Sequence, residues 1–426
     1  MDDSHDAGAV DSPDEAIRRL VAEGASAFVR DSSERVALSA SRGRILAEAL
    51  RADRDSPPFD HSAMDGYAIR IADLVSGREL PVLGESRPGA APPMMPACRG
   101  CIRIATGAPR PLDAGSTDGG DAVVRREDVL EHVAAESDDV VSITISEGVV
   151  PRPGEHWRRR GDNARVGQVL LESGAPIGAG AVAALATCGI AEPLVQQALS
   201  VALLTTGEEV VPVESRPNDH QIRNGNAAGL AALLAARPWI RVGTVEHVPD
   251  EFDRLSRALA SAIESHHAVV LTGGVSMGHR DLVRAAIEAN GGRVVFHRVP
   301  QRPGRPMLGA VCETSRGAVA LFGLPGNPLS ALTAARRIAI PVLAAGAGVA
   351  MRPAREVQID AETDAVSSDL WRYRLATLDA AGRVALVPSR SSGDVISAGR
   401  SDGFVEIPGG RSVQADERYP FHGWDD

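Results

Sequence analysis

The sequence predicts a multidomain α/β protein built on a central doubly wound, mostly parallel α/β domain. An N-terminal α+β region, a small mostly-β domain and a C-terminal β domain are expected around it. Segment 198–346 alternates strand-like and helix-like runs, which is the pattern of right-handed βαβ units. Residues 57–153, and the stretch after Pro353, instead carry short β-branched runs separated by glycine and proline. With 426 residues, the chain is long enough for several domains.

These textures divide the chain into segments. We expect a disordered tail at 1–12, an N-terminal helical and mixed domain from 13–56 and 154–197, a mostly-β insert at 57–153, the α/β domain at 198–350 and a C-terminal β domain at 351–426. Ser12 and Glu15 form a capping box with Pro13 at the first helical position, which predicts a helix to about Phe28. Apolar spacing predicts a second helix across 39–51.

The α/β domain has the clearest pattern. Its expected strands are 200–205, 241–247, 267–272, 293–299 and 318–323, and its expected helices are 225–236, 250–265, 280–290 and 327–344. The C-terminal domain is expected to carry strands at 355–360, 370–378, 383–387 and 404–407.

Three glycine-rich turns, at 205–209, 272–278 and 324–328, each follow a strand-like run and each open a helix-like run. Ligands of doubly wound sheets bind at the carboxyl ends of the strands, and helix N-termini there offer unpaired N–H groups and partial positive charge. The turns therefore predict a site for a phosphate-bearing or otherwise anionic ligand. None of them is a Walker loop or a dinucleotide-binding fingerprint.

Acidic residues cluster beside these turns, and they are Glu208, Glu209, Asp250, Glu251 and Asp281. Carboxylates next to bound phosphate repel it unless a divalent cation lies between them, which favours Mg²⁺. The alternative is that acids at helix starts only favour the helix dipole.

A second charged segment, at 296–306, carries Arg298, Arg302 and Arg305 among proline and glycine residues. A stiff loop of this kind is suited to an oxyanion or phosphate, and the alternative is a solvated basic loop.

Composition excludes several classes of protein. The net charge of −11 argues against a general nucleic-acid binder or a basic membrane surface. All 45 basic residues are arginine. Four cysteines are too few for a disulfide framework, so a cytoplasmic location is expected, and we interpret the Cys98–Cys101 pair as incidental thiols, with metal or redox roles as alternatives. We expect neither a signal peptide nor a membrane span.

Seven ordered motifs resemble the molybdopterin molybdenumtransferase family, MoeA. They are PFDHSAMDGYA at 58–68, IATGAP at 104–109, DAVV at 121–124, TTGEE at 205–209, TGGVSMG at 272–278 with Asp281, PGRP at 303–306 and LPGNP at 324–328. The resemblance covers roughly residues 13–410 and implies a molybdopterin-binding type of α/β domain. It also implies a Mg²⁺-dependent enzyme that inserts molybdate into adenylylated molybdopterin and releases AMP.

The resemblance further implies a homodimer whose cleft lies between the α/β domain of one subunit and the SAMDG-bearing domain of the other. Transient contact with molybdopterin adenylyltransferase or apo-molybdoenzymes is also expected. By motif, the residues implied as catalytic are Asp65, Thr106, Glu209, Asp250, Asp281, Arg302 and Arg305. Those implied as ligand-binding are Thr206, Gly207, Asn226, Gly273, Gly274, Ser276, Gly278, Arg298, Pro325, Gly326, Asn327 and Pro328. Those implied as metal ligands are Glu209, Asp250, Glu251 and Asp281.

The chain departs from the family pattern at some positions. Arginine replaces the usual lysine in the 298–305 segment, Gly225 stands where serine or threonine is usual, and 115–120 lengthens a loop. Two alternative functions remain. One is molybdopterin adenylyltransferase activity, because the α/β domain resembles that enzyme, and the other is a non-catalytic dimeric scaffold.

Overall fold

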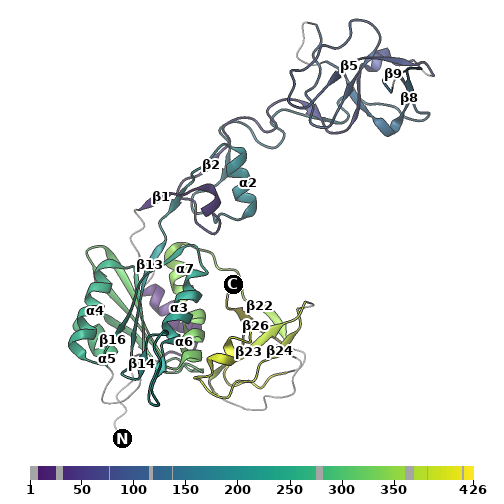
Figure 1. Ribbon diagram of the computed structural model, residues 1–426. Helices are drawn as coiled ribbons and strands as arrows, with labels where there is room; N and C mark the ends of the chain where they lie inside the picture. Colours follow the sequence, from purple (N-terminus) through teal and green to yellow (C-terminus); the bar gives the residue numbers. More distant parts are fainter. Residues whose placement is uncertain are drawn as a thin grey trace. The chain divides into compact units, whose positions relative to one another are not determined.

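The computed structural model describes residues 8–24, 32–75, 77–114, 119–136, 138–274, 282–359, 369–380, 382–414 and 417–426. The chain forms two compact units (Figure 1). The first, called here the sheet unit, comprises Met1–Glu48, Ser173–Val182 and Glu192–Asp426. The second, called the insert unit, comprises Ala49–Glu172 and Ala183–Ala191.

The sheet unit is built on a six-stranded sheet. Its strand order is β16 (Ile240–Val248), β13 (Leu199–Thr206), β17 (Ala268–Thr272), β21 (Gly317–Leu324), β20 (Leu308–Thr314) and β18 (Arg293–His297). The first four strands pair in parallel, and β20 is antiparallel to both of its neighbours. The predicted doubly wound, mostly parallel sheet is confirmed, whereas β20 was not among the expected strands.

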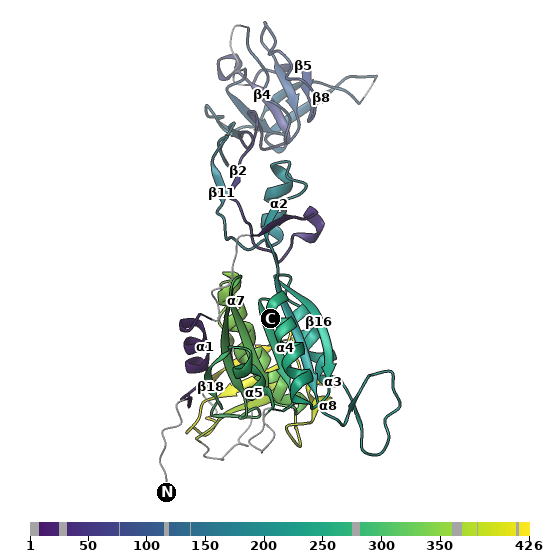
Figure 2. The same ribbon diagram turned by 90° about the vertical axis from the view of Figure 1, so that its left-hand side faces the viewer.

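Helices cover both faces of this sheet (Figures 1 and 2). One face packs against α4 (Phe252–Ser265) and α5 (Leu282–Ala289). The other packs against α1 (Pro13–Ala22), α3 (Gly225–Ala235) and the run α6 (Pro328–Ala334), η4 (Ala335–Ala339) and α7 (Ile340–Ala347). Successive residues of β13 point to opposite faces of the sheet. Val201 and Leu203 lie in the hydrophobic core on one face, and Ala202 and Leu204 lie in the core on the other.

The last of these helical runs, expected as one helix over 327–344, is interrupted by the π-helical segment η4. Pro341 lies in the first turn of α7. Among the described residues, Pro328–Ala347 is the one stretch with the length and hydropathy of a membrane span, and 83% of its apolar window is buried inside the protein. It is therefore a core helix of the sheet unit.

The N-terminal predictions had mixed outcomes. The N-cap is confirmed, since the Ser12 hydroxyl accepts a hydrogen bond from the Glu15 amide at 3.1 Å and α1 begins at Pro13. The reciprocal half of the predicted capping box is not formed, because the Glu15 carboxylate instead accepts from Arg18 and Arg19. The helix ends at Ala22, and the predicted end near Phe28 lies outside the described residues.

The predicted helix over 39–51 is wrong. The structure has the 3₁₀ turn η1 (Leu38–Ala40), isolated bridges at Ile45 and Leu46, and strand β2 (Leu50–Arg51) paired with β11 (Val169–Leu171). Long-range pairing provides the backbone hydrogen bonds here, including Leu46 N–H to the Ala175 carbonyl at 3.0 Å. Strand β1 (Ser33–Arg35) likewise pairs with β12 (Leu194–Gln196), and α2 spans Ala179–Thr187.

The C-terminal domain is a separate sheet within the sheet unit. Its order is β19 (Gln301–Arg302), β23 (Trp371–Leu378), β25 (Gly403–Ile407), β26 (Arg418–Gly423) and β22 (Arg355–Gln358), with β24 (Val384–Leu386) paired to β23 and the short helix α8 (Val395–Ala398) nearby. The four expected strands are present. One strand, β19, comes from the arginine-bearing segment of the α/β domain, so the two sheets are joined there.

The insert unit contains the predicted mostly-β structure. Its sheet has the order β7 (Ala122–Arg125), β4 (Gly66–Ile69), β6 (Cys101–Ile104), β5 (Leu80–Ser86), β9 (Val140–Ile145) and β8 (Val129–Val133). A smaller ladder pairs β3 (His61–Ser62) with β10 (Trp157–Arg158), and the 3₁₀ turns η2 (Ile71–Asp73) and η3 (Arg126–Asp128) flank strands of the sheet.

Candidate functional site

A cavity of about 400 Å³ lies where β13, β17 and β21 of the sheet unit end. All three glycine-rich turns contribute to it. The described residues that line it are Thr205, Thr206, Gly207, Glu209, Val210, Ile222, Arg223, Asn224, Gly225, Asn226, Asp250, Thr272, Gly273, Gly274, Pro306, Pro325, Gly326, Asn327 and Pro328. The sequence argument that the carboxyl ends of these strands meet is therefore confirmed, and we call this cavity the turn pocket.

Close backbone packing brings the turns together. Gly273 has a φ of +91°, and a Cβ there would lie 2.6 Å from the Thr206 carbonyl oxygen of the first turn. A Cβ on Gly326 of the third turn would lie 3.5 Å from the Gly273 Cα. Gly273 is thus required both by its conformation and by its neighbour.

The first turn does not open a helix directly, which corrects one sequence expectation. After Glu209 the chain forms β14 (Val210–Val211), which pairs in parallel with β15 (Ile222–Arg223), and α3 begins only at Gly225. This short ladder returns the chain to the pocket, so the N-terminus of α3 still lines it together with the N-terminus of α6. Helix N-termini carry a partial positive charge, which suits an anionic ligand.

Two asparagines connect α3 to the turns. Asn224 caps the helix by accepting from the Ala227 amide at 3.0 Å, and its Nδ2 donates to the Thr205 hydroxyl at 2.8 Å. Asn226 donates from Nδ2 to the Gly326 carbonyl at 2.8 Å. Its Oδ1 is buried and has no hydrogen-bond partner among the described residues. A buried acceptor without a partner is suited to a donor on a ligand.

Two of the predicted acids, Glu209 and Asp250, line the turn pocket, and both are exposed to solvent. The Thr206 hydroxyl donates a hydrogen bond to Asp250 Oδ1. Glu251 instead forms an ion pair with Arg254 at 3.0 Å and is not among the described lining residues. Asp281, Ser276 and Gly278 lie outside the described residues.

Within the described part of the chain, no three His, Cys, Asp or Glu side chains form a group that could hold a metal. The described lining residues include two carboxylates, those of Glu209 and Asp250. Mg²⁺ commonly binds one or two protein carboxylates when substrate phosphates complete its coordination shell.

The arginine loop, residues 298–306, reaches the pocket through Pro306. Arg298 is half-buried, while Arg302 and Arg305 are exposed. Neither Arg302 nor Arg305 has a side-chain hydrogen bond or ion pair with any described residue. The loop thus carries two guanidinium groups without a described partner, and Pro306 is its one residue among the described lining residues, which include none of the three arginines.

The C-terminal domain also contacts the third turn, which sequence reasoning missed. Asn327 Nδ2 donates to the Ser392 hydroxyl at 2.8 Å, and the Ser330 amide of α6 donates to the Ser392 carbonyl at 3.3 Å. The signal that could have found it is the polar run from Ser389 to Asp394, which interrupts an otherwise β-rich segment.

Asp65 and Thr106 lie together in the insert unit. Asp65 Oδ1 accepts from the Thr106 amide at 2.6 Å and from the Thr106 hydroxyl at 2.8 Å. These two bonds, the amide first, lower the pKa of the Asp65 carboxyl. Both residues are exposed, so the unit presents an ionised, oriented carboxylate to solvent.

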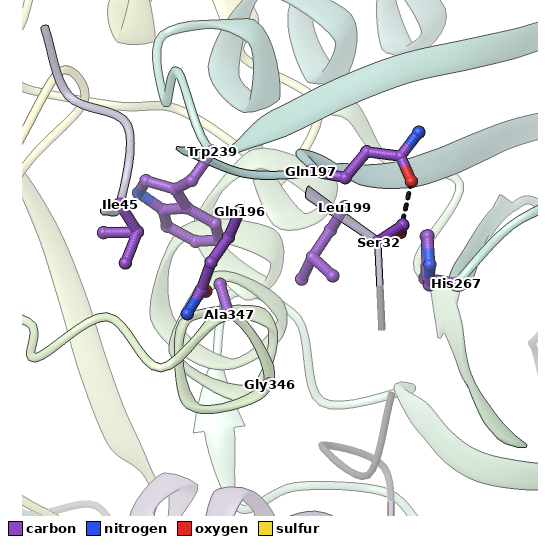
Figure 3. Close-up of a pocket in the computed structure, with 9 residues that line it drawn as sticks. All are labelled: Ser32, Ile45, Gln196, Gln197, Leu199, Trp239, His267, Gly346 and Ala347. Carbon is purple, nitrogen blue, oxygen red and sulfur yellow. Dashed lines mark hydrogen bonds between the residues drawn. The ribbon is translucent and has the colours of Figure 1, made fainter. Parts of the chain in front are cut away.

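A much smaller cavity, of about 20 Å³, lies at the opposite ends of the strands (Figure 3). Leu199, which begins β13, and His267, which precedes β17, line it with Trp239. The Ser32 hydroxyl donates to Gln197 Oε1 at 2.5 Å at its edge. A cavity of this size holds a single water at most, so the turn pocket is the candidate site.

Two family models match the chain. The MoeA N-terminal region (domain I and II) matches residues 12–189, and the probable molybdopterin binding domain matches residues 202–345. A molybdopterin molybdenumtransferase of Synechococcus elongatus is 34% identical over 416 residues, covering 94% of this chain and 96% of the relative. The chain belongs to the molybdopterin molybdenumtransferase (MoeA) family.

Other comparisons agree with the MoeA assignment. A Synechocystis molybdopterin molybdenumtransferase is 29% identical over 90% of this chain and 93% of its own length. The crystal structure of a molybdopterin biosynthesis MoeA protein from Pyrococcus horikosii superposes with a TM-score of 0.74 at 27% identity, covering 98% of this chain and 99% of that one. The MoeA N-terminal model spans Asp65 and Thr106, and the molybdopterin binding domain model spans all described lining residues of the turn pocket.

Proposed function

We propose that the turn pocket binds adenylylated molybdopterin and that the protein inserts molybdate into it there, with release of AMP. The family assignment makes the protein a transferase of molybdenum cofactor biosynthesis. The observation that carries the proposal is the convergence of three glycine turns, two helix N-termini and two carboxylates in one cavity of about 400 Å³. That volume is in the usual range for small-molecule sites.

The charges around the pocket support an anionic ligand. Residues at the starts of α3 and α6 line the cavity, and helix N-termini favour bound phosphate. Arg302 and Arg305 have no side-chain partner among the described residues, so their guanidinium groups are available to the diphosphate and to molybdate. The buried Oδ1 of Asn226 is available to a ligand donor.

The donor set of the pocket fits Mg²⁺. Glu209 and Asp250 would hold the ion, and the hydrogen bond from Thr206 fixes one carboxylate oxygen of Asp250. When bound, Mg²⁺ supplies positive charge that offsets the phosphates and polarises the diphosphate for cleavage. The protein's own groups orient the substrate, and we expect no covalent enzyme intermediate.

We also propose that the active unit is a homodimer, in which Asp65 and Thr106 of one subunit serve the turn pocket of the other. The supporting observation is that Asp65 is exposed, has a lowered pKa and is oriented by Thr106. The four cysteines are free thiols, which supports a cytoplasmic location.

The test is AMP release from preformed adenylylated molybdopterin with Mg²⁺, with and without molybdate. We expect molybdate-dependent AMP release, reduced by about 10²-fold in Glu209→Gln. Glu208→Gln is the matched control, because Glu208 is exposed and is not among the described lining residues. Formation of adenylate from molybdopterin and ATP, without molybdate-dependent release, would support the adenylyltransferase alternative. Absence of both reactions would support a scaffold.

A further inference from the structure

Gln301 lies in the middle of the arginine loop, and its side chain is completely buried. Arg302, next to it, and Arg305, which follows, are both exposed. A buried amide needs a hydrogen-bond partner for its oxygen and for its nitrogen. The partners of Gln301 therefore show what this side chain does for the loop.

Each end of the amide has a partner from a different part of the sheet unit. Nε2 donates to the Gly304 carbonyl at 3.0 Å, three residues further along the loop. Oε1 accepts from the Tyr373 hydroxyl at 2.8 Å, on strand β23 of the C-terminal domain. A carbonyl only accepts, so Gly304 must face the NH₂ group, and this fixes the orientation of the amide.

Tyr373 is suited to be a permanent donor. It is 5% exposed, and burial, followed by the nearby Glu406 carboxylate, raises the pKa of its hydroxyl well above 10. The hydroxyl is therefore protonated at neutral pH. Tyr373 of the C-terminal domain thus fixes the Gln301 side chain, and Gln301 in turn fixes the loop through its bond to Gly304.

The loop is packed closely at the residue that Gln301 bonds. Gly304 has a φ of +99°, and a Cβ there would lie 3.0 Å from Gln301 Nε2 and 3.4 Å from the Ser330 carbonyl of α6. On the other side, the Trp371 amide donates to the Pro300 carbonyl at 2.7 Å. The loop is therefore held between β23 and the helix whose N-terminus lines the turn pocket.

We infer that Gln301 is a positioning residue for molybdenum insertion, which clamps the arginine loop to Tyr373 so that Arg302 and Arg305 face the anionic substrates in one geometry. The inference rests on the proposed function, in which these arginines bind anions. If the loop backbone were mobile, both arginine side chains would lose more conformational freedom on binding a substrate than they lose on a fixed loop. Gln301 would therefore strengthen substrate binding without contacting the substrate.

The test compares full-length variants in the AMP-release assay, with KM for the adenylylated substrate and kcat measured separately. Gln301→Met keeps the length of the side chain and removes the amide. Since a misplacement of about 1 Å costs up to about 10²-fold, we expect KM to rise by about tenfold or more, with a smaller change in kcat. Tyr373→Phe removes one oxygen and should raise KM less, and the double variant should match Gln301→Met, because the two residues act as one unit.

Tyr419→Phe is the matched control. Its hydroxyl is hydrogen-bonded to Glu417 at 2.9 Å and to the Gln414 amide at 2.9 Å in the same domain, so the change should leave KM unaltered. Circular dichroism at the assay temperature checks that each variant is folded. If Gln301→Met does not fold, Tyr373→Phe carries the test, because it loses only a hydroxyl.

Arg305→Ala separates this inference from the proposed function. If Arg305→Ala raises KM while Gln301→Met and Tyr373→Phe leave it at the wild-type value, the positioning role is overturned and the anion-binding loop stands. If Arg305→Ala leaves KM unchanged, the role proposed for the loop itself fails.

Discussion

The buried ion pair between Arg337 and Glu406 gives the prediction that can be worked furthest. Arg337 lies in the π-helical segment η4 and Glu406 on β25, with side chains 9% and 3% exposed. Two hydrogen bonds join them, one of 3.0 Å from Arg337 Nη2 to Glu406 Oε1. His422 Nε2 adds a bond of 2.8 Å to the same carboxylate. The perturbation is Glu406→Gln, which keeps the shape and removes the charge.

The magnitude follows from the pKa of Glu406. Burial alone would raise the pKa, but the hydrogen bonds from His422 and Arg337 outweigh it and lower the pKa from 4.5 to about 2. At about 1.4 kcal/mol per pKa unit, this difference corresponds to about 3 kcal/mol of folding stability. Removing one partner of a buried pair costs about 3–5 kcal/mol in other proteins, which agrees. We expect Glu406→Gln to lower the free energy of unfolding by about 3 kcal/mol at pH 7.

The sign of the pH dependence is fixed by the lowered pKa. The unfolded carboxyl binds a proton below pH 4.5, whereas the folded one binds it only near pH 2. The stabilisation is therefore complete above pH 4.5 and is lost as the pH falls from 4.5 toward 2. From the same two values, the stabilisation that ionised Glu406 itself contributes should be about 1 kcal/mol smaller at pH 4 than at pH 7.

Urea unfolding, followed by tryptophan fluorescence, measures the free energy of unfolding of the wild type and of Glu406→Gln at pH 7 and pH 4. Trp424 reports on this region, because its ring lies 5.4 Å from that of Phe404 in the C-terminal domain. Glu417→Gln is the control, since its pair with Arg411, at 2.9 Å, has side chains 36% and 64% exposed and should contribute less than about 1 kcal/mol. A loss below about 1 kcal/mol in Glu406→Gln at pH 7 would refute the reasoning.

Three further predictions concern the site. Asp250→Asn should raise the Mg²⁺ concentration for half-maximal AMP release by about tenfold or more. Glu251→Gln should not raise it, because Glu251 is paired with an arginine. Equal effects of the two changes would contradict the metal assignment. Gly273→Ala should impair substrate binding far more than Gly291→Ala. Both glycines have positive φ, but only a Cβ on Gly273 would clash with a backbone oxygen. Similar KM values for the two variants would contradict this prediction. Asp65→Asn should slow AMP release by about 10²-fold without changing the thermal midpoint, and an unaltered rate would remove Asp65 from the mechanism.

The inner strands β13, β17 and β21 of the central sheet were predictable because they are buried on both faces and therefore read as continuous apolar runs. Strand β13, with every residue buried, is the clearest case. Strand β20 escaped prediction because Gly309 lies near its start and reads as a break in a strand. The structure gives the reason for that glycine, since a Cβ there would lie 2.6 Å from the ring of Phe296 on the neighbouring strand. That contact cannot be predicted from local composition.

The incorrect helix over 39–51 has a similar origin. Ile45, Leu46 and Leu50 have a spacing that a helix tolerates, yet Ile45 and Leu46 are adjacent and both are buried. Their backbone groups pair with segments about 130 to 150 residues away, including the bridge from Leu46 to Val195. Helical spacing is a weak prior, and long-range strand pairing overrides it here.

The turn pocket shows which parts of the candidate site local sequence patterns can predict and which parts depend on long-range contacts. Parallel strands place their carboxyl ends at one edge, so the sequence alone could bring Thr206, Gly273 and Pro325 together. It also located the charged groups of the arginine loop. It could not show what holds that loop in place, because the bond from Tyr373 to Gln301 spans 72 residues and ties the loop to strand β23 of the C-terminal domain. Residues that bear chemistry are thus visible in local patterns, whereas residues that fix their geometry depend on which distant elements pack against them.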